Sequence, residues 1–204
     1  MSKAVIISAG SITDYEYTKS FIGKDDFVIC ADGGYAHAEK MGVVPSLTVG
    51  DFDSYKGEVC GEIIMFNPEK DYTDTHIAVN KALEKGYDEI YLLGATGTRL
   101  DHTLANIGLL EYIAMKGAKG FVVNENNIIT VIRRNTVIKS DKSRRLSLIP
   151  IGIVKGVTLK NLKYTLDNYN MTFDQSIGIS NEFTDEDAII EIKEGSLIVM
   201  MTKD

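Results

Sequence analysis

Six aspartates in this sequence are of the residue type that builds a site for magnesium and phosphate. Each follows an apolar, strand-like run or stands at the start of a helix that comes after such a run. They are Asp32, Asp51, Asp53, Asp71, Asp74 and Asp101. In an open α/β sheet the loops beyond the carboxyl ends of the strands share one crevice, so acids far apart in sequence can converge there. Mg²⁺ prefers oxygen ligands, usually one or two carboxylates with waters and substrate phosphates. The acids therefore indicate a metal-nucleotide substrate rather than a bare anion.

The segment Gly50–Ser54 carries two acids, Asp51 and Asp53, that are two residues apart. In extended backbone their side chains leave the same face, so both can reach one cation. Two like charges on one face repel, and a bound cation relieves that cost. The alternative is a solvated turn, because Asp and Ser favour turns whatever the protein does.

The turn Asp32-Gly33-Gly34 follows an expected strand and precedes an expected helix. Its glycines would let the backbone come close to a ligand, while a helix N-terminus faces a phosphate. An ordinary turn is the alternative.

The segment Asp71–Thr75 places two acids, Asp71 and Asp74, three residues apart at an expected helix start. That spacing predicts both on one face of the first helical turn. Acids near a helix N-terminus are also favoured by the helix dipole and by capping, and either Thr73 or Asp74 can be the cap. The alternative is that one acid of the pair serves only the helix.

The segment from Gly94 to His102 combines a strand end, a glycine-containing loop and a helix start that bears Arg99, Asp101 and His102. Arg99 can fork onto phosphate oxygens and neutralise charge that develops during phosphoryl transfer. For Asp101 three roles are open: helix cap, metal ligand or orienter of Arg99. His102 is either a proton carrier or a hydrogen-bonded residue of the helix start.

Alternating strand and helix signals must position these residues. Apolar runs predict strands at 4–8, 27–31, 47–49, 63–66, 90–93 and 121–123. Helical spacing and stop signals predict helices over 14–21, from the Asp32 turn to Gly42, from Thr73 or Asp74 to Lys85–Gly86, and from the Arg99 region to Gly117. This order predicts an α/β domain over residues 1–124.

From about Asn124 the pattern changes to short alternating runs, at 128–132, 136–139, 146–149, 153–159, 188–192 and 196–201. Such runs without a helical stretch predict a compact antiparallel sandwich or barrel. We place this second domain at residues 125–204.

Composition narrows the class of protein. The formal charge of −7 argues against a nucleic-acid partner, which needs a basic face. Cys30 and Cys60 are too few for a disulfide framework, and Cys30 lies in an apolar run typical of a core. The first residues are apolar too briefly for a signal peptide or a membrane span, so we expect a cytoplasmic protein. Neither the P-loop pattern nor G-x-G-x-x-G is present.

Over nearly its whole length the chain resembles the thiamine pyrophosphokinases, also called thiamine diphosphokinases. The segments that carry the resemblance, in matching order and spacing, are Ala31–Gly34, Gly50–Ser54, Asp71–Thr75, Gly97–Asn106 and Ile179–Phe183. The resemblance implies an N-terminal α/β catalytic domain with a mostly parallel sheet, then an all-β antiparallel sandwich domain that contributes to the thiamine site and the dimer. It further implies a homodimer with active sites between subunits.

The implied reaction moves the diphosphoryl group of ATP to the hydroxyl of thiamine, giving thiamine diphosphate and AMP, with Mg²⁺ required. The residues that the resemblance assigns to the metal are Asp51, Asp53, Asp71 and Asp74. Those it assigns to ATP are Asp32, Gly33, Asp51, Arg99, Asp101 and His102. Those it assigns to thiamine are Asp74, Tyr164, Ser180 and Asn181. The residues expected to carry the reaction are Asp71, Asp74, Arg99 and Asp101, with Asp74 orienting the thiamine hydroxyl.

Three positions qualify the resemblance. Tyr164 stands where many relatives have Trp or Tyr, and its aromatic face would suit a flat cationic ring, although core packing is the alternative. Relatives often carry a second glycine where this chain has Thr98, which would narrow the backbone approach to phosphate. They frequently carry Thr where this chain has Ile179, at the thiamine side.

Two other functions stay open on the sequence. One is a pyrophosphokinase for another hydroxyalkyl heterocycle, such as a pterin, and the second domain would decide between that ring and thiamine. The other is a non-catalytic nucleotide-binding or sensor protein. The presence of all six acids together with Arg99 argues against the sensor, because a mere binder has little use for so many neighbouring negative charges.

Overall fold

The structure, a computed structural model, describes residues 3–50, 61–65 and 71–204, so Asp51 and Asp53 lie outside the described residues. Internal contacts divide the chain into two units, one up to Glu125 and the other from Asn126 to Asp204. Each unit has its own strands and its own buried side chains. None of the helices in the described ranges is long and apolar enough to cross a membrane.

A parallel sheet forms the centre of the N-terminal unit. Its strands are β1 (Ala4–Ile7), β2 (Phe27–Ala31), β3 (Leu47–Gly50), β4 (Glu62–Met65), β5 (Glu89–Leu93) and β6 (Lys119–Val123). They lie in the order β4-β3-β2-β1-β5-β6, and every neighbouring pair is parallel. The central strand β1 is wholly buried, as expected for an aliphatic strand with helices on both faces of its sheet. The parallel sheet expected from the alternating pattern is confirmed.

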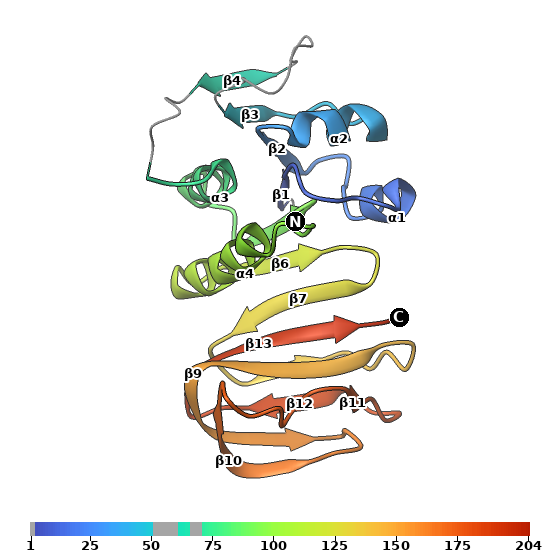
Figure 1. Cartoon of the computed structure of the whole chain (residues 1–204), viewed down its shortest axis with the longest axis vertical. Helices are drawn as coiled ribbons and strands as arrows, with labels where there is room; N and C mark the ends of the chain where they lie inside the picture. Colours follow the sequence, from blue (N-terminus) through green and yellow to red (C-terminus); the bar gives the residue numbers. More distant parts are fainter. Residues whose placement is uncertain (1–2, 51–60, 66–70) are drawn as a thin grey trace. The chain divides into compact units, whose positions relative to one another are not determined.

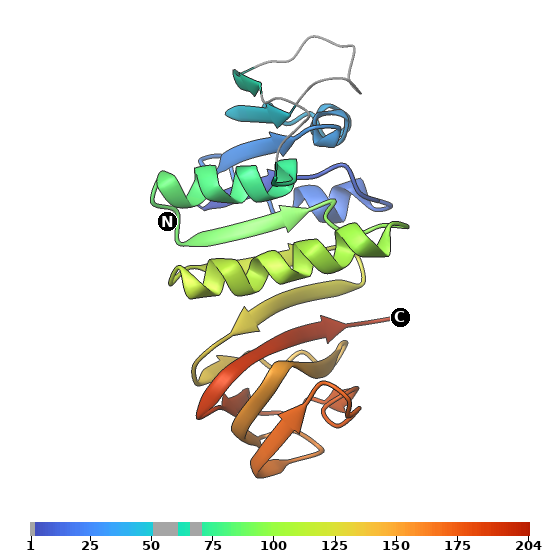
Figure 2. The same cartoon turned by 60° about the vertical axis from the view of Figure 1, so that its left-hand side comes forward.

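Helices cover the two faces of this sheet. They are α1 (Tyr15–Lys19), α2 (Gly34–Met41), α3 (Asp74–Glu84) and α4 (Leu100–Met115). α1 and α2 lie on one face and α3 and α4 on the other (Figure 1), and α3 and α4 run side by side (Figure 2). From β1 the chain adds β2, β3 and β4 on one side of the sheet and then adds β5 and β6 on the other side of β1. Because parallel crossovers are right-handed, this change of direction places the later helices on the opposite face. The strand order therefore switches between β1 and β5.

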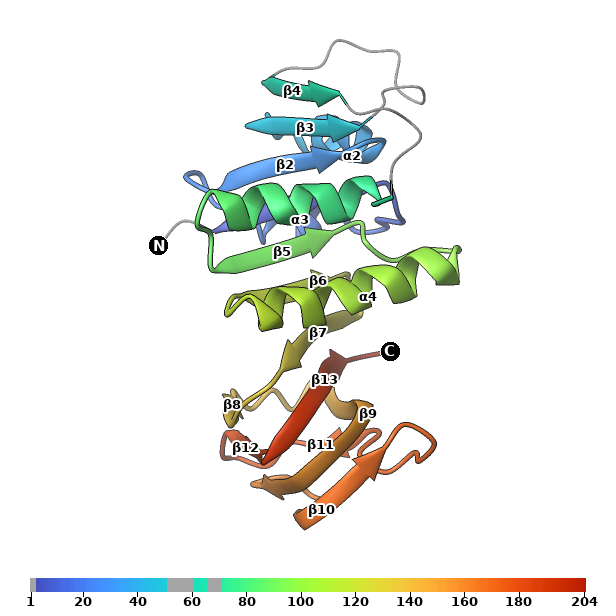
Figure 3. The ribbon, with the colours of Figure 1, turned by 90° about the vertical axis from the view of Figure 1, so that its left-hand side faces the viewer.

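The stop signals read from the sequence act as expected. α2 ends at Gly42, whose φ of 63° is left-handed, a conformation that glycine adopts without strain. α4 is followed by Gly117 with φ 83°. The carboxyl ends of β2, β3 and β5 and the first turns of α3 and α4 lie at one edge of the sheet (Figure 3). With β1 and β5 as neighbours, this edge is the topological switch point at which open α/β sheets bind ligands.

The C-terminal unit is antiparallel. Its strands are β7 (Asn127–Ile132), β8 (Thr136–Ile138), β9 (Arg145–Lys160), β10 (Leu166–Thr172), β11 (Asn181–Glu182), β12 (Ala188–Glu191) and β13 (Glu194–Thr202). The first part of β9 pairs with β13, and its last part pairs with β10 and β12. Side chains from both parts, such as Leu148 and Val157, belong to one buried cluster.

Two features of this unit differ from the expected pattern. The runs at 146–149 and 153–159 are one strand, β9, because the glycine between them, Gly152, has a φ of 70° and lets the strand continue through a distortion. The strands β10 and β11 were not expected, and β10 is the longer of the two. It reads Leu-Asp-Asn-Tyr-Asn-Met-Thr, and Met171 is its one fully buried residue, so it lacks the alternation that marks a half-buried strand.

Candidate functional site

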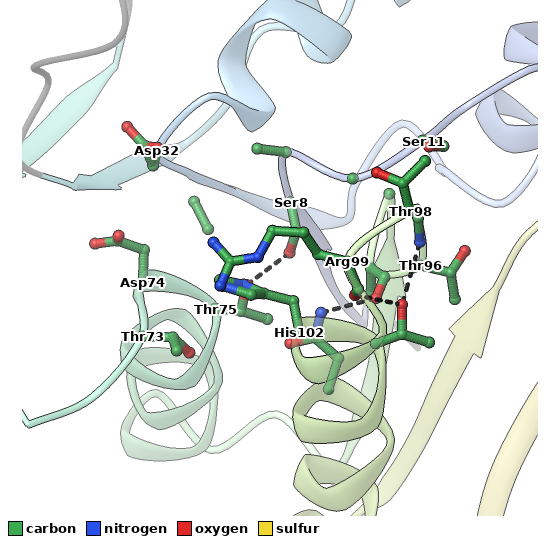
Figure 4. A pocket seen from close by; sticks show the side chains of 18 residues that line it. Ser8, Ser11, Asp32, Thr73, Asp74, Thr75, Thr96, Thr98, Arg99 and His102 are labelled. Carbon is green, nitrogen blue, oxygen red and sulfur yellow. Dashed lines mark hydrogen bonds between the residues drawn. The ribbon is translucent and has the colours of Figure 1, made fainter.

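A cavity of about 510 Å³ opens at the switch point of the N-terminal unit. The loops after β1, β2 and β5 and the first turns of α3 and α4 line it. We call it the switch-point cavity. It brings together Asp32, Arg99 and His102, which were expected to bind ATP, and Asp74, which was expected to bind the metal and thiamine. In the view of Figure 4, the two acids lie on one side of the cavity and Thr96 and Thr98 on the other. Arg99 and His102 lie between these two groups.

Two loops are hydrogen-bonded together to make one wall of the cavity. The loop after β1, residues 8–11, donates from Gly10 N–H to the Gly94 carbonyl at 2.7 Å and from Ser11 N–H to the Thr96 carbonyl at 2.7 Å. A Cβ at position 10 would lie 2.4 Å from both of those carbonyl oxygens, so only glycine fits. Backbone hydrogen bonds therefore fix this wall of the cavity.

Side chains tie this wall to the helices. Ser8 Oγ lies 2.9 Å from Thr75 Oγ1 in the first turn of α3. Asn106 of α4, which is buried, donates from Nδ2 to the Ala95 carbonyl at 2.7 Å. These bonds hold the N-termini of α3 and α4 against the strand ends, where their free N–H groups favour anions.

Asp32 occupies the turn after β2 with a φ of 45°. Left-handed backbone is uncommon for residues other than glycine and concentrates at functional sites, although Asp tolerates it better than most. Gly34 serves close packing of the backbone, because a Cβ at this position would lie 1.9 Å from the Ile7 carbonyl oxygen. Gly33, expected to bind ATP, is the N-cap of α2 and is not among the residues that line the cavity.

Asp71 and Asp74 do not share a helical turn, because α3 begins at Asp74 and Thr73 is its N-cap. Thr73 Oγ1 accepts from the His76 N–H at 3.2 Å, so the alternative in which an acid caps this helix is wrong. Asp74 is half-buried and lines the cavity, whereas Asp71 is exposed and lies outside the lining. The first-turn geometry expected for the pair is therefore wrong, and Asp74 is the member that faces the cavity.

Arg99 is held by Asp101. The Arg99 Nη2 donates to Asp101 Oδ2 at 2.6 Å, and its Nε donates to Oδ1 at 3.2 Å. These bonds from Arg99, with a backbone bond involving His102, lower the pKa of Asp101 to about 2. Since α4 begins at Leu100 with Arg99 at the N-cap position, Asp101 is not the helix cap, and that alternative is wrong. The carboxylate orients the guanidinium; its role as a metal ligand stays a prediction.

The donors in the switch-point cavity suit a hard cation. Asp32 and Asp74 supply carboxylate oxygens, and the neighbouring serine and threonine residues supply hydroxyls. Mg²⁺ commonly takes one or two protein carboxylates and completes its shell with waters and phosphates. No group of three His, Cys, Asp or Glu side chains within residues 3–50, 61–65 and 71–204 is placed to hold a metal ion. The residues present fit Mg²⁺ shared with substrate phosphates.

A second cavity, of about 270 Å³, lies in the C-terminal unit and is lined by Tyr164, Ile179 and Asn181 among others. Tyr164 is 58% exposed, so the alternative that it packs in the core is wrong. Asn181 is buried, accepts from the Tyr164 N–H at 3.0 Å and donates to the Tyr164 carbonyl at 2.7 Å. Its amide thus holds the Tyr164 backbone. Ser180, with φ 57°, is not among the lining residues.

The sequence analysis did not identify the uncharged polar residues that line the switch-point cavity. Ser8, Ser11, Thr75 and Asn106 all line the switch-point cavity, yet none was assigned chemistry. The available signal was the strand-turn-helix order after β1, which is the same order that singled out Asp32. The departures at Thr98 and Ile179 both fall on cavity walls.

Cys30 is buried in β2, as its apolar run predicts, and burial raises the pKa of its thiol to about 12. Its thiol is therefore protonated at neutral pH and serves as a small core side chain.

Comparisons with known proteins match both units. The family model described as thiamin pyrophosphokinase, catalytic domain, matches residues 18–122, and the model described as its vitamin B1 binding domain matches residues 131–198. The thiamine pyrophosphokinase of Bacillus subtilis is 30% identical over 186 residues, which cover 86% of this chain and 87% of that protein.

Solved structures agree in fold over the full length of the chain. A crystal structure of the Bacillus subtilis thiamine pyrophosphokinase has a TM-score of 0.90 at 27% identity and covers 100% of both chains. One of a thiamin pyrophosphokinase from Geobacillus thermodenitrificans has a TM-score of 0.85 at 28% identity, covering 100% of this chain and 98% of that one.

Proposed function

Because the chain belongs to the thiamin pyrophosphokinase family, it is a diphosphotransferase, and we propose that it transfers the diphosphoryl group of ATP to thiamine in the switch-point cavity. The products are thiamine diphosphate and AMP. The observation that carries the proposal is the convergence of Asp32, Asp74 and Arg99 on one cavity at the switch point. Such a site offers charge neutralisation and positioning, which phosphoryl transfer chiefly requires.

The transfer balances as a single in-line displacement at the β-phosphorus of ATP. The thiamine hydroxyl oxygen bonds to that phosphorus while the bond to the oxygen bridging the α-phosphate breaks. AMP leaves with the bridging oxygen, and the hydroxyl proton is released. In this scheme Asp74 accepts a hydrogen bond from the attacking hydroxyl and so fixes its direction, and Arg99 forks onto phosphate oxygens as negative charge shifts toward AMP.

Mg²⁺ is the metal that this site fits, and Asp32 and Asp74 would hold it, together with Asp51 and Asp53 from outside the described residues. When bound, it would neutralise phosphate charge. Asp71 is kept as a proposed ligand from the family resemblance, although it does not line the cavity.

One assay tests the reaction. The purified protein, incubated with ATP, Mg²⁺ and thiamine, should release AMP and thiamine diphosphate in equal amounts, and chelation of Mg²⁺ by EDTA should stop both. Resolving the nucleotides chromatographically separates the outcomes. Thiamine-dependent ADP would mean that a single phosphoryl group moves, and ATP left unconsumed would mean that the protein only binds nucleotide.

For the thiamine ring, we propose the exposed face of Tyr164 in the C-terminal cavity, within the segment that matches the vitamin B1 binding domain. Residues 131–198 thereby favour thiamine over a pterin as the acceptor. The thiazolium ring is cationic, and an aromatic face attracts a cation by about 0.5–2 kcal/mol.

Removal of the Tyr164 ring should therefore weaken the binding of thiamine and leave the binding of ATP unchanged. In Tyr164→Ala we expect the KM for thiamine to rise roughly 2- to 30-fold while the KM for ATP stays unchanged. Tyr164→Phe keeps the aromatic face and is the matched control, expected near wild type. Steady-state kinetics with each substrate varied in turn gives the answer. Equal loss in the Ala and Phe variants would assign the role to the hydroxyl, and an unchanged KM in both would remove Tyr164 from the site.

A homodimer with active sites between subunits is the assembly we propose. Leu100 and Leu104, on the first turns of α4 beside the lining residues, are 71% and 67% exposed. Leucines that border a catalytic cavity are the kind of surface that an oligomer covers. Sedimentation equilibrium should return about twice the 22.5 kDa of one chain, and a fully active particle of one-chain mass would rule the dimer out.

A further inference from the structure

A histidine outside the lining of the switch-point cavity is hydrogen-bonded to the loop that forms one of the cavity walls and to a residue of another helix. His37 of α2 places Nε2 at 2.8 Å from the Gly10 carbonyl oxygen and Nδ1 at 2.8 Å from the Tyr15 hydroxyl. Tyr15 is the first residue of α1. Neither His37 nor Tyr15 lines the cavity, whereas Gly10 does. The chain Tyr15–His37–Gly10 therefore links two helices to a loop that would face the substrate.

The proton positions in this chain follow from the acceptor at its end. A carbonyl oxygen can only accept, so Nε2 of His37 must carry the hydrogen. In the neutral imidazole Nδ1 is then an acceptor, and the Tyr15 hydroxyl donates to it. The hydrogen bond from Tyr15 to Nδ1 thus favours the His37 tautomer whose Nε2 donates to the Gly10 carbonyl.

Gly10 has no side chain with which to anchor itself. Its N–H donates to the Gly94 carbonyl and its C=O accepts from His37, so both backbone polar groups of this residue are hydrogen-bonded. Ser8 and Ser11, on either side of it, line the cavity. Loss of the His37 bond would leave a partly buried carbonyl without its donor and free the loop to shift.

We propose that His37 is a positioning residue that holds the 8–11 loop in the form that binds the phosphate donor, an inference that rests on the proposed function of the switch-point cavity. It acts through the Gly10 carbonyl and touches no reacting atom. Its contribution therefore falls on affinity for the nucleotide rather than on the acceptor or the chemical step.

The test compares variants that remove and that restore the donor. His37→Leu removes both hydrogen bonds at similar volume and should weaken binding of the nucleotide roughly 10-fold. His37→Gln keeps an N–H for the Gly10 carbonyl and should recover most of that loss. Glu39→Gln, an exposed change two residues along α2, is the matched control and should bind as wild type.

Affinity is measured by calorimetry with the Mg²⁺ complex of α,β-methylene ATP, whose bridging carbon blocks the bond that would break. KM values for ATP and thiamine are measured beside it. A rise in the dissociation constant and in the KM for ATP, with the KM for thiamine unchanged and rescue by Gln, is the expected result. Unchanged nucleotide affinity in His37→Leu, or equal loss for both substrates without rescue, would overturn the proposal.

Failure of the proposed reaction and failure of a variant to fold can each be distinguished from failure of this proposal. A wild-type protein that binds the analogue but forms no AMP would refute the proposed reaction and leave the positioning role standing. If His37→Leu does not fold, Tyr15→Phe carries the test, because it deletes one oxygen atom. It should weaken analogue binding by roughly 3-fold through loss of the fixed tautomer, and wild-type affinity in that variant would overturn the proposal.

Discussion

Substitution of Arg99 by methionine is expected to lower kcat/KM for ATP by about 10²- to 10³-fold, with most of the loss in kcat. Arg99 carries its charge at any assay pH, lines the switch-point cavity and is already oriented by Asp101. A preorganised cation that meets charge developing on phosphate acts in the transition state more than in the ground state, which is why kcat takes the loss.

Three controls test whether the two parallel donors of the Arg99 guanidinium are responsible for this loss. Arg99→Lys keeps the charge but not the two parallel donors, so it should recover only part of the activity. Lys116→Met, at the C-cap of the same helix, removes an exposed cation far from the lining and should be active. The Arg99–Asp101 pair is exposed, so the melting temperature of Arg99→Met should stay near wild type. Wild-type turnover of a folded Arg99→Met protein would exclude Arg99 from the transfer step.

The second large effect is expected at Asp74. Asp74→Asn should lower kcat by about 10²- to 10⁴-fold, because an amide cannot bind Mg²⁺ as a carboxylate does and orients a hydroxyl less strongly. The substitution keeps the shape of the side chain. It also leaves the cap of α3 intact, since that cap is Thr73.

Folding can be separated from catalysis at this position. An acid in the first turn of a helix contributes only about 0.3–1 kcal/mol through the helix dipole, so Asp74→Asn should unfold within a few degrees of wild type. Glu84→Gln, the same chemical change in the last turn of α3, should retain full turnover. If turnover and stability of Asp74→Asn fall together, the role of Asp74 is structural. If raised Mg²⁺ restores its kcat, metal binding is the part that was lost.

Local chemistry determined the secondary elements of the N-terminal unit. Most aliphatic runs became buried strands, although β4 is largely exposed, and glycines such as Gly42 and Gly117 ended or followed helices. These signals act between neighbours in the chain. The same local rules failed for β10, which has no regular alternation of buried and exposed side chains, and for the break expected inside β9. In both places, pairing with other strands overrides the local pattern.

The sequence also determined the types of residue that could do chemistry, namely acids at strand ends and an arginine at a helix start. Their roles needed finer geometry than spacing provides. Asp71 and Asp74 looked equivalent by spacing, yet a single residue, Thr73, fixes where α3 begins and leaves only Asp74 on the cavity. Of the three roles open to Asp101 by spacing, the structure excludes the helix cap and shows the contact that orients Arg99.

Only the tertiary structure decided which of these residues meet. Asp32, Asp74 and Arg99 come from segments separated by tens of residues, and they share one cavity because β1 and β5 are neighbours where the chain reverses across the sheet. The bond from His37 to Gly10 joins residues 27 apart and left no trace in any local pattern. Sequence alone set the elements and their chemical groups, because those depend on neighbours in the chain. Strand order and helix packing set the site, because convergence depends on contacts that exist only once the sheet has formed.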